Sequence, residues 1–279
     1  MLLYQQESWW SLLSPLNLVR KLYRQRSLLR QFTWRNIEIQ HKGSTLGLLW
    51  SVLSPLLLFA VYAFVFVVIF KGRFGVVPTE TRVDYAIGLF LGLALLQLFQ
   101  EALTVSPLSV VQNPNYVKKV VFPVEILPVA AFGAALFRCL VSLGLVMVAC
   151  VFWGPGLSPA AWWLPFIVFM LGLLSLGMGW ILAAVGVFVR DLVPLMQFFS
   201  ILLMFTSAVF YSGDQIPHAF AFLRLSPVLI VIETGRAALL WHIQPATGTL
   251  VYLGIVSVAT CILGHAFFCA AKPAFADVV

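Results

Sequence analysis

Charged residues are scarce in this chain: Asp, Glu, Lys and Arg make up only 10% of its 279 residues. Hydrophobic residues make up 62%, and the mean hydropathy is +1.01. Soluble globular domains carry roughly 25% charged residues. The low charge content therefore excludes a soluble domain and indicates a membrane protein, because a bilayer can solvate so much apolar surface.

The motifs of nucleotide binding, metal binding and hydrolysis are also missing. The sequence contains no GxxxxGK[ST], no HExxH, no CxxC and no GxSxG. Its four histidines are scattered, and its four cysteines all fall inside predicted spans, where they are expected to be buried and apolar. We therefore expect no enzyme activity, no metal and no cofactor in this chain, so that a partner or an ion gradient must supply any energy.

Long apolar runs are abundant. A transmembrane helix needs about 20 apolar residues, and six stretches meet that need. They are Gly47–Phe70, Tyr85–Val111, Val124–Phe152, Trp162–Val189, Leu192–Tyr211 and Leu250–Ala271. The sequence therefore predicts an all-α integral membrane protein with six transmembrane helices.

The Lys and Arg residues predict which side each terminus occupies. With the N-terminus inside, eleven of them fall on the cytoplasmic side and five outside, while Arg138 lies within a span. Cytoplasmic loops of membrane proteins carry this excess, so both termini are predicted to be cytoplasmic. The net charge of +7 is accounted for in this way and does not imply a nucleic-acid partner.

A basic amphipathic helix is expected before the first span, starting at Ser14-Pro15. One face carries apolar residues and the opposite face carries basic ones. The apolar set is Leu18, Leu22, Leu29 and Phe32, and the basic set is Arg20, Arg24, Arg35 and Lys42. This pattern is typical of a helix at the membrane interface. The helix could be a lipid anchor or, because Gly43-Ser44-Thr45 joins it directly to the first span, a mechanical lever.

Polar residues recur at helical spacing inside the second and third spans. Gln97, Gln100, Glu101 and Thr104 share one face, and Arg138 and Ser142 share another. A charge at membrane depth is costly and needs a partner or a water-filled cavity. We therefore expect Glu101 and Arg138 to pair, either as a structural ion pair or on a polar conduit. Phe59, Tyr62 and Phe66 share a face of the first span and could form an aromatic lining.

The segment from residue 213 to 248 is apolar only in patches. Its polar and helix-breaking residues include Asp214, Pro217, Arg224, Pro227, Glu233 and Arg236. Two short helices that dip into the outer leaflet fit this pattern better than a seventh span, which would move the C-terminus outside. Earlier in the chain, Ser175, Gly179 and Ala183 form a ridge of small residues that favours close helix packing.

A cassette between the second and third spans, NPNYVKKVVFPVEILPV (Asn113–Val129), resembles the permease subunit of type-2 ABC exporters. The resemblance is to the polysaccharide and polyol-phosphate branch of that family. Further landmarks occur in family order: Lys42 through Trp50 and Pro55, then Arg190-Asp191, Ser207–Tyr211, and the stretch with Ser226, Pro227, Glu233 and Arg236. Each landmark is weak alone, but together they span nearly the whole chain.

The resemblance implies a homodimer that works with two separate ATP-binding subunits, which would hold the ATP and Mg²⁺. It implies export of a lipid-linked polysaccharide such as O-antigen, in lipopolysaccharide biosynthesis, across a bacterial inner membrane. The residues facing the ATPase would be Arg24, Arg30, Arg35, Asn113, Pro114, Lys118, Lys119, Arg190 and Asp191. The channel would be lined by residues from the aromatic and polar sets, including Gln97, Gln100, Glu101 and Arg138, and the short outer helices would gate its periplasmic mouth.

These inferences predict three regions. Residues 1–46 form a cytoplasmic segment with the interfacial helix, 47–271 form the transmembrane domain with gate helices at about 213–248, and 272–279 form a cytoplasmic tail. Within the same architecture, capsular polysaccharide and teichoic acid exporters remain alternatives. An ion-coupled secondary transporter would predict paired repeats with broken helices, and a membrane-embedded transferase would need clustered acids or histidines; the sequence offers neither.

Overall fold

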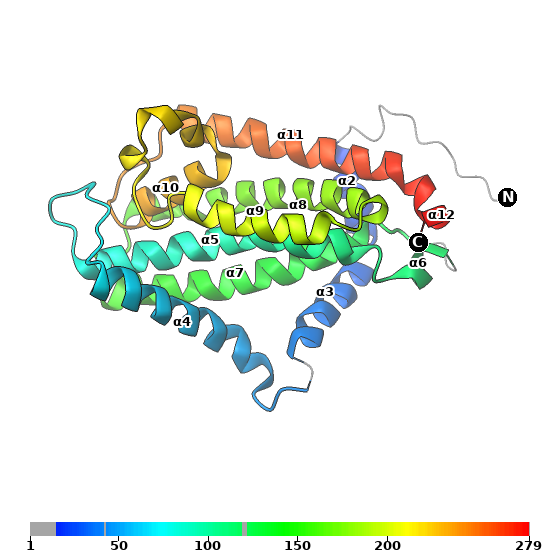
Figure 1. Ribbon diagram of the computed structural model, residues 1–279, viewed down its shortest axis with the longest axis horizontal. Helices are drawn as coiled ribbons and strands as arrows, with labels where there is room; N and C mark the ends of the chain where they lie inside the picture. Colours follow the sequence, from blue (N-terminus) through cyan, green and yellow to red (C-terminus); the bar gives the residue numbers. More distant parts are fainter. Residues whose placement is uncertain (1–14, 42, 119–121, 279) are drawn as a thin grey trace.

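The computed structural model describes residues 15–41, 43–118 and 122–278. The predicted roles of Ser14, Lys42 and Lys119 lie outside these residues. Within them every regular element is a helix, as the sequence predicts. Four long helices lie side by side as a bundle (Figure 1): α5 (Arg82–Ser109), α7 (Ile126–Phe152), α8 (Leu164–Phe188) and α11 (Thr247–Ala271).

The bundle has two unlike ends. One end holds the short helices α6 (Pro114–Lys118) and α12 (Phe275–Val278), and we call it the α6 end. The other holds η5 (His218–Leu225) and α10 (Pro227–Leu239), and we call it the α10 end. The turn between α8 and α9 returns the chain at the α6 end (Figure 1).

Five helices of the described chain are long and apolar enough to cross a membrane: Gly47–Ile69, Arg82–Ser109, Ile126–Phe152, Pro159–Phe188 and Thr247–Ala274. They match five of the six predicted spans. The first is composite, with a 3-10 turn η1 (Gly47–Leu49), the helix α4 (Trp50–Ala63) and a π-helical turn η2 (Phe64–Ile69). The chain is therefore an all-α, multi-pass membrane protein.

The remaining predicted span, Leu192–Tyr211, was wrong in its extent. Helix α9 (Leu192–Thr206) ends after 15 residues, which rise about 22 Å, less than the ~30 Å of a hydrocarbon core. The helix cannot continue because Ala208 adopts a left-handed conformation with φ of 53°.

The irregular segment after α9 contains the two expected short helices, η5 and α10, and before them a single 3-10 turn, η4 (Gly213–Gln215). Helices η5 and α10 meet at a bend of 83°, and Pro227 stands at the first position of α10, where proline is favoured. Such a bent pair is the shape of either a broken span or a re-entrant loop, so the re-entrant assignment stays a prediction.

The core lies between α5 and α8. Most of the apolar stretch of both helices is buried, and α8 packs closely on α11 because two glycines face each other. A Cβ added at Gly264 would overlap the carbonyl oxygen of Gly177. Within the predicted ridge, Gly179 lies against Ser106 of α5. The small residues therefore pack helices within this chain.

The basic amphipathic segment forms two helices, α2 (Pro15–Arg24) and α3 (Arg26–His41), instead of one. Its apolar face packs on protein: Phe32 is buried against the α6 end of α7 and α8, and Leu18, Leu22 and Leu29 pack on the same cluster. Ile37 is also buried. The segment is therefore docked on the bundle, which a purely lipid-facing anchor would not require.

The joint after α3 turns the chain sharply, and α4 then starts away from the bundle and runs back to it at the α10 end (Figure 1). Gly43 and Gly47 bracket the joint with φ of 86° and 51°, values that only glycine adopts readily. The joint stands off from the bundle about halfway along its length, so the turn between the amphipathic segment and the first span does not sit at the α6 end (Figure 1).

Candidate functional site

The polar residues of the second and third spans meet in the middle of the bundle. Arg138 of α7 donates from Nε to Oε1 of Glu101 of α5 at 2.9 Å, and its Nη2 binds the second carboxylate oxygen. A two-point contact is the strongest geometry for this pair. The pairing predicted from sequence is therefore present, and it joins α5 to α7.

The amphipathic segment reaches the same pair. Nη1 of Arg138 contacts Oε1 of Gln40, near the end of α3, and Gln97 donates to Glu101 at 3.3 Å. Beside these side chains lies a cavity of about 360 Å³. Its lining residues are Gln40, Ser44, Trp50, Ser51, Ser54, Pro55, Gln97, Arg138 and Ser142. Gln100 points elsewhere, donating to the carbonyl oxygen of Ser200 on α9 at 2.7 Å.

The three predicted lining aromatics attach α4 and η2 to the rest of the chain. Phe59 stacks on Phe90 of α5 with ring centroids 4.5 Å apart, and Phe66 stacks on Phe210 at 4.2 Å. The Tyr62 hydroxyl contacts the sulfur of Met204 at 3.2 Å. Their ring faces are engaged by protein in this chain, so a role in lining a channel stays a prediction.

The residues predicted to meet an ATPase gather at the α6 end only in part. Arg24, Arg30, Pro114, Lys118, Arg190 and Asp191 are exposed. Arg35 and Asn113 are brought together instead: Nη2 of Arg35 donates to Oδ1 of Asn113 at 3.3 Å. The Arg35 guanidinium also lies 4.5 Å above the Phe32 ring. Arg35 therefore fastens α3 to the loop before α6 from within.

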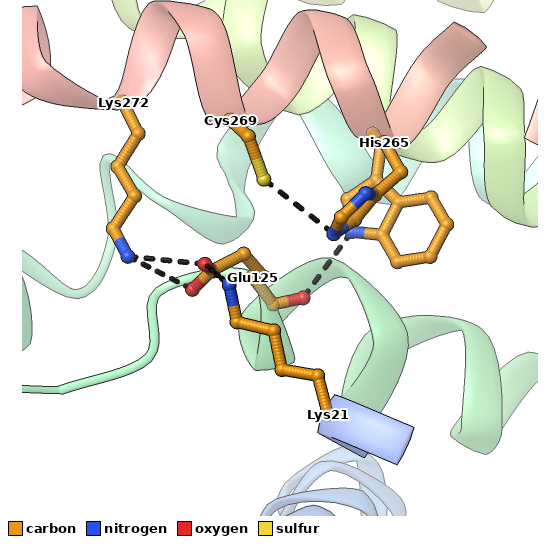
Figure 2. Close-up of polar contacts among 6 residues, drawn as sticks. Lys21, Glu125, His265, Cys269 and Lys272 are labelled. Atoms are coloured by element: carbon orange, nitrogen blue, oxygen red, sulfur yellow. Dashed lines mark hydrogen bonds and ion pairs between the residues drawn. The ribbon is translucent and has the colours of Figure 1, made fainter. Parts of the chain in front are cut away.

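One acidic residue at the α6 end was missed by sequence reasoning. Glu125, only 3% exposed, precedes α7 and binds two lysines from distant parts of the chain (Figure 2). Its carboxylate lies 2.8 Å from Nζ of Lys21 on α2, and 3.1 and 3.0 Å from Nζ of Lys272 after α11. Burial would raise the pKa of Glu125, but Lys272 and Lys21 outweigh it and lower that pKa to about 2.

A second layer supports this ion cluster. The buried indole of Trp180 on α8 donates to the backbone oxygen of Glu125 at 3.2 Å. The same indole packs edge-on against His265, whose Nε2 lies 3.4 Å from Sγ of Cys269 (Figure 2). Glu125 thus joins the amphipathic segment, α7, α8 and the end of α11. In the sequence, Glu125 could have been noticed as an isolated acidic residue among apolar ones in the cassette Asn113–Val129.

Comparison with known proteins decides the family. Residues 27–240 match the family described as "ABC-2 type transporter". The chain belongs to the ABC-2 type transporter family. The match begins next to Arg26, where α3 starts, and ends just after α10. It therefore includes the ion pair, the cavity and Glu125.

Curated ABC-2 relatives resemble this chain along almost all of its length. A Klebsiella pneumoniae protein named "O-antigen export system permease protein RfbA" is 26% identical over 259 residues, which cover 90% of this chain and 95% of that protein. A Myxococcus xanthus protein of the same name is 26% identical over 267 residues, covering 95% of this chain and all of that protein.

At the α10 end of this ABC-2 chain, the predicted gate residues differ in their surroundings. Asp214 and Pro217 are exposed, and Pro227 is half-buried. Arg224 donates to the carbonyl oxygen of Ile216 at 3.0 Å. Glu233 and Arg236 share α10, as their spacing suggests, but each bonds to backbone: Glu233 accepts from the amide of Gly213, and Arg236 donates to the carbonyls of Ala208 and Tyr211.

Arg236 is fully buried, with its guanidinium 4.2 Å above the ring of Phe74. The loop that carries Phe74 is closed by a second acid that the sequence did not reveal. Glu80, 6% exposed, accepts the amides of Phe74 and Gly75 at 2.9 and 2.8 Å. These residues hold the α10 end together, and a gating role for them stays a prediction. In the described part of the chain, no cluster of three or more His, Cys, Asp or Glu side chains could hold a metal ion.

Proposed function

We propose that this chain is the membrane-spanning permease of an ATP-driven exporter that moves lipid-linked polysaccharide of the O-antigen type across the bacterial inner membrane. Two copies would form the translocation path, and two separate ATP-binding subunits would hold ATP and Mg²⁺ and supply the energy. This chain would carry out no hydrolysis itself.

The observation that carries the proposal is the end-to-end similarity to permeases named for O-antigen export, in a chain of the ABC-2 type transporter family. That family normally functions as the permease of a transporter with an ATP-binding subunit. The relatives' names favour O-antigen over capsule or teichoic acid as the cargo.

The orientation follows from charge. The α6 end carries the exposed basic residues Arg24, Arg30, Lys118 and Arg190, and an excess of Lys and Arg marks the cytoplasmic side. We assign the α6 end, both termini and the ATPase contact to the cytoplasm, and the α10 end to the periplasm. The first span, Gly47–Ile69, supports a dimer because its most apolar 18 residues contain no buried residue in the described chain.

Deleting the gene in its native host tests the proposal. We expect the O-antigen polysaccharide to disappear from the cell surface while its lipid-linked form accumulates at the cytoplasmic face of the inner membrane. A plasmid copy of the gene should restore surface display. Normal surface polysaccharide in the deletion strain, with no lipid-linked accumulation, would refute the assigned cargo.

A further inference from the structure

The cavity beside Arg138 is neutral despite the arginine in its wall. The guanidinium is bound at Nε and Nη2 by Glu101 and at Nη1 by Gln40. The positive charge is thus matched by a carboxylate within hydrogen-bonding distance. A phosphate or diphosphate entering the cavity would meet the Glu101 charge as well as that of Arg138, so an anionic ligand gains little there.

The rest of the lining consists of groups that both donate and accept hydrogen bonds. Four serines and two glutamines are among its lining residues: Ser44, Ser51, Ser54, Ser142, Gln40 and Gln97. Ser51 and Ser142 are buried. Hydroxyl and amide groups match the hydroxyls of a sugar, which also donate and accept. An acyl chain forms no hydrogen bond with hydroxyl or amide groups and is therefore a poorer match to this lining than a sugar.

One aromatic ring completes the set. Trp50, the first residue of α4, also lines the cavity, as does Pro55 of the same helix. A flat indole face suits the apolar C–H face of a pyranose ring, and its N–H offers one further donor. The cavity of about 360 Å³ is at the lower end of the roughly 300–1,000 Å³ of small-molecule sites. It has room for a short segment and not for a folded polymer.

The cavity is lined by residues from both the amphipathic segment and the first span. Gln40 and Ser44 belong to the end of α3 and the joint after it, Trp50 and Ser54 to α4, and the others to α5 and α7. The cavity therefore lies between the amphipathic segment and the first span, beside α5 and α7. Gly43 and Gly47, both with positive φ, bracket the wall that carries Ser44.

We propose that this cavity is a carbohydrate-binding subsite that takes one or two uncharged sugar units of the cargo, stacked on Trp50 and hydrogen-bonded by the serine and glutamine side chains. The inference rests on the proposed export of polysaccharide. On this proposal, residues at and around the α3–α4 joint bind the sugar units of the cargo. The diphosphate of a lipid-linked cargo does not bind in the cavity.

A protection experiment tests the proposal on the purified transporter with its ATP-binding subunit. Ser54→Cys is treated with N-ethylmaleimide, and mass spectrometry follows alkylation at position 54 alone, so that Cys139, Cys150, Cys261 and Cys269 need not be replaced. Maltotetraose is the neutral probe, and inorganic pyrophosphate is the charged one. At about ten times its Kd, maltotetraose should slow alkylation about tenfold, and pyrophosphate should leave the rate unchanged.

Matched variants make the result specific. Ala60→Cys lies on the same helix, is exposed and does not line the cavity, so its alkylation should be unaffected by maltotetraose. Adding Trp50→Leu should abolish protection at position 54, whereas Trp34→Leu, which changes an exposed indole of α3, should not. If Ser54→Cys does not assemble, Ser44→Cys in the joint before α4 reports on a second lining position.

Protection by pyrophosphate but not by maltotetraose would overturn the proposal in favour of a head-group site. Protection by neither probe, or protection that survives Trp50→Leu, would also overturn it. These outcomes are independent of the export assay, because a transporter that displays polysaccharide yet shows no protection refutes the subsite alone.

Discussion

At the residue scale, the buried or partly buried charges of Glu125, Arg138 and Arg236 each have more than one partner. Glu125 binds two lysines, Arg138 binds Glu101 and Gln40, and Arg236 binds two backbone carbonyls. Burial makes a charge costly unless it is paired and hydrogen-bonded. Removing one partner of such a charge should therefore lower the free energy of unfolding by more than removing an exposed charge does.

Glu125→Gln should lower the stability of the purified protein by about 1–3 kcal/mol at neutral pH. Lys21 and Lys272 lose their shared carboxylate, although both are partly exposed and can recover some hydration. Thermal unfolding in detergent would measure the loss. Glu38→Gln, at an exposed position of α3, is the control and should change little.

The same variant tests the pKa of Glu125. Because this pKa is lowered to about 2 from 4.5, the stabilisation is present above pH 4.5 and is lost as the pH falls from 4.5 towards 2. The wild-type protein should therefore lose more stability over this range than Glu125→Gln. If stability fell with pH by the same amount in both proteins, the assigned ion cluster would be contradicted.

The Glu101–Arg138 pair predicts a rescue. Reversing either charge alone, Glu101→Arg or Arg138→Glu, places two like charges together in the middle of the bundle and should abolish export or folding. The double reversal should restore much of the protein level and activity, since it recreates the pair. A double variant no better than the single ones would contradict this prediction. It would show that Gln40 and Gln97 accept the two charges in only one arrangement.

At the element scale, α8 and α11 cross in close backbone contact at Gly177 and Gly264. Gly264→Ala would bring a methyl group onto the carbonyl of Gly177, forcing the helices apart at a cost of about 1–3 kcal/mol or more. Gly254→Ala on the same helix has open space around its Cβ and should be neutral or slightly stabilising, because alanine favours helix. The unfolding temperature of Gly264→Ala should be clearly lower than that of Gly254→Ala. Equal unfolding temperatures would contradict the close crossing of α8 and α11.

The elements that the sequence predicted well are those with a strong local signal. Long apolar runs and helical spacing gave five of the spans and the Glu101–Arg138 pair. The end of α9 was missed because the left-handed Ala208 sits in an apolar run that continues to Tyr211. Glu125 and Glu80 were missed because their partners, a lysine more than a hundred residues away and two loop amides, are defined only by the tertiary fold.

At the scale of the whole molecule, the amphipathic segment has polar contacts with the bundle at both of its ends, in addition to the Arg35–Asn113 contact and the apolar packing of Phe32. Lys21 reaches Glu125 at the α6 end, and Gln40 reaches Arg138 in the middle. A push on this segment would thus reach α7 directly as well as through the joint at Gly43–Gly47. The sequence had suggested the joint alone.

This arrangement sharpens the expected effect of the basic residues. The exposed Arg24 and Arg30, replaced together by Glu, should uncouple ATP hydrolysis from export while the protein remains in the membrane. Arg35→Glu should act differently, lowering stability because Arg35 binds Asn113 and covers Phe32. ATPase rate, export and thermal unfolding measured on the same preparations separate the two effects. Unchanged export in the Arg24, Arg30 double variant would contradict the lever and would leave lipid anchoring as the role of the amphipathic segment.

The most direct test of the account is transport by the purified complex in proteoliposomes. The affinity-tagged chain should carry an ATP-binding subunit with it through purification, and the reconstituted complex should move lipid-linked O-antigen polysaccharide into the vesicles. We expect the polymer to become protected from added glycosidase only when ATP and Mg²⁺ are supplied outside. Protection without any ATP-binding subunit, or no protection with one present and hydrolysing ATP, would contradict the account.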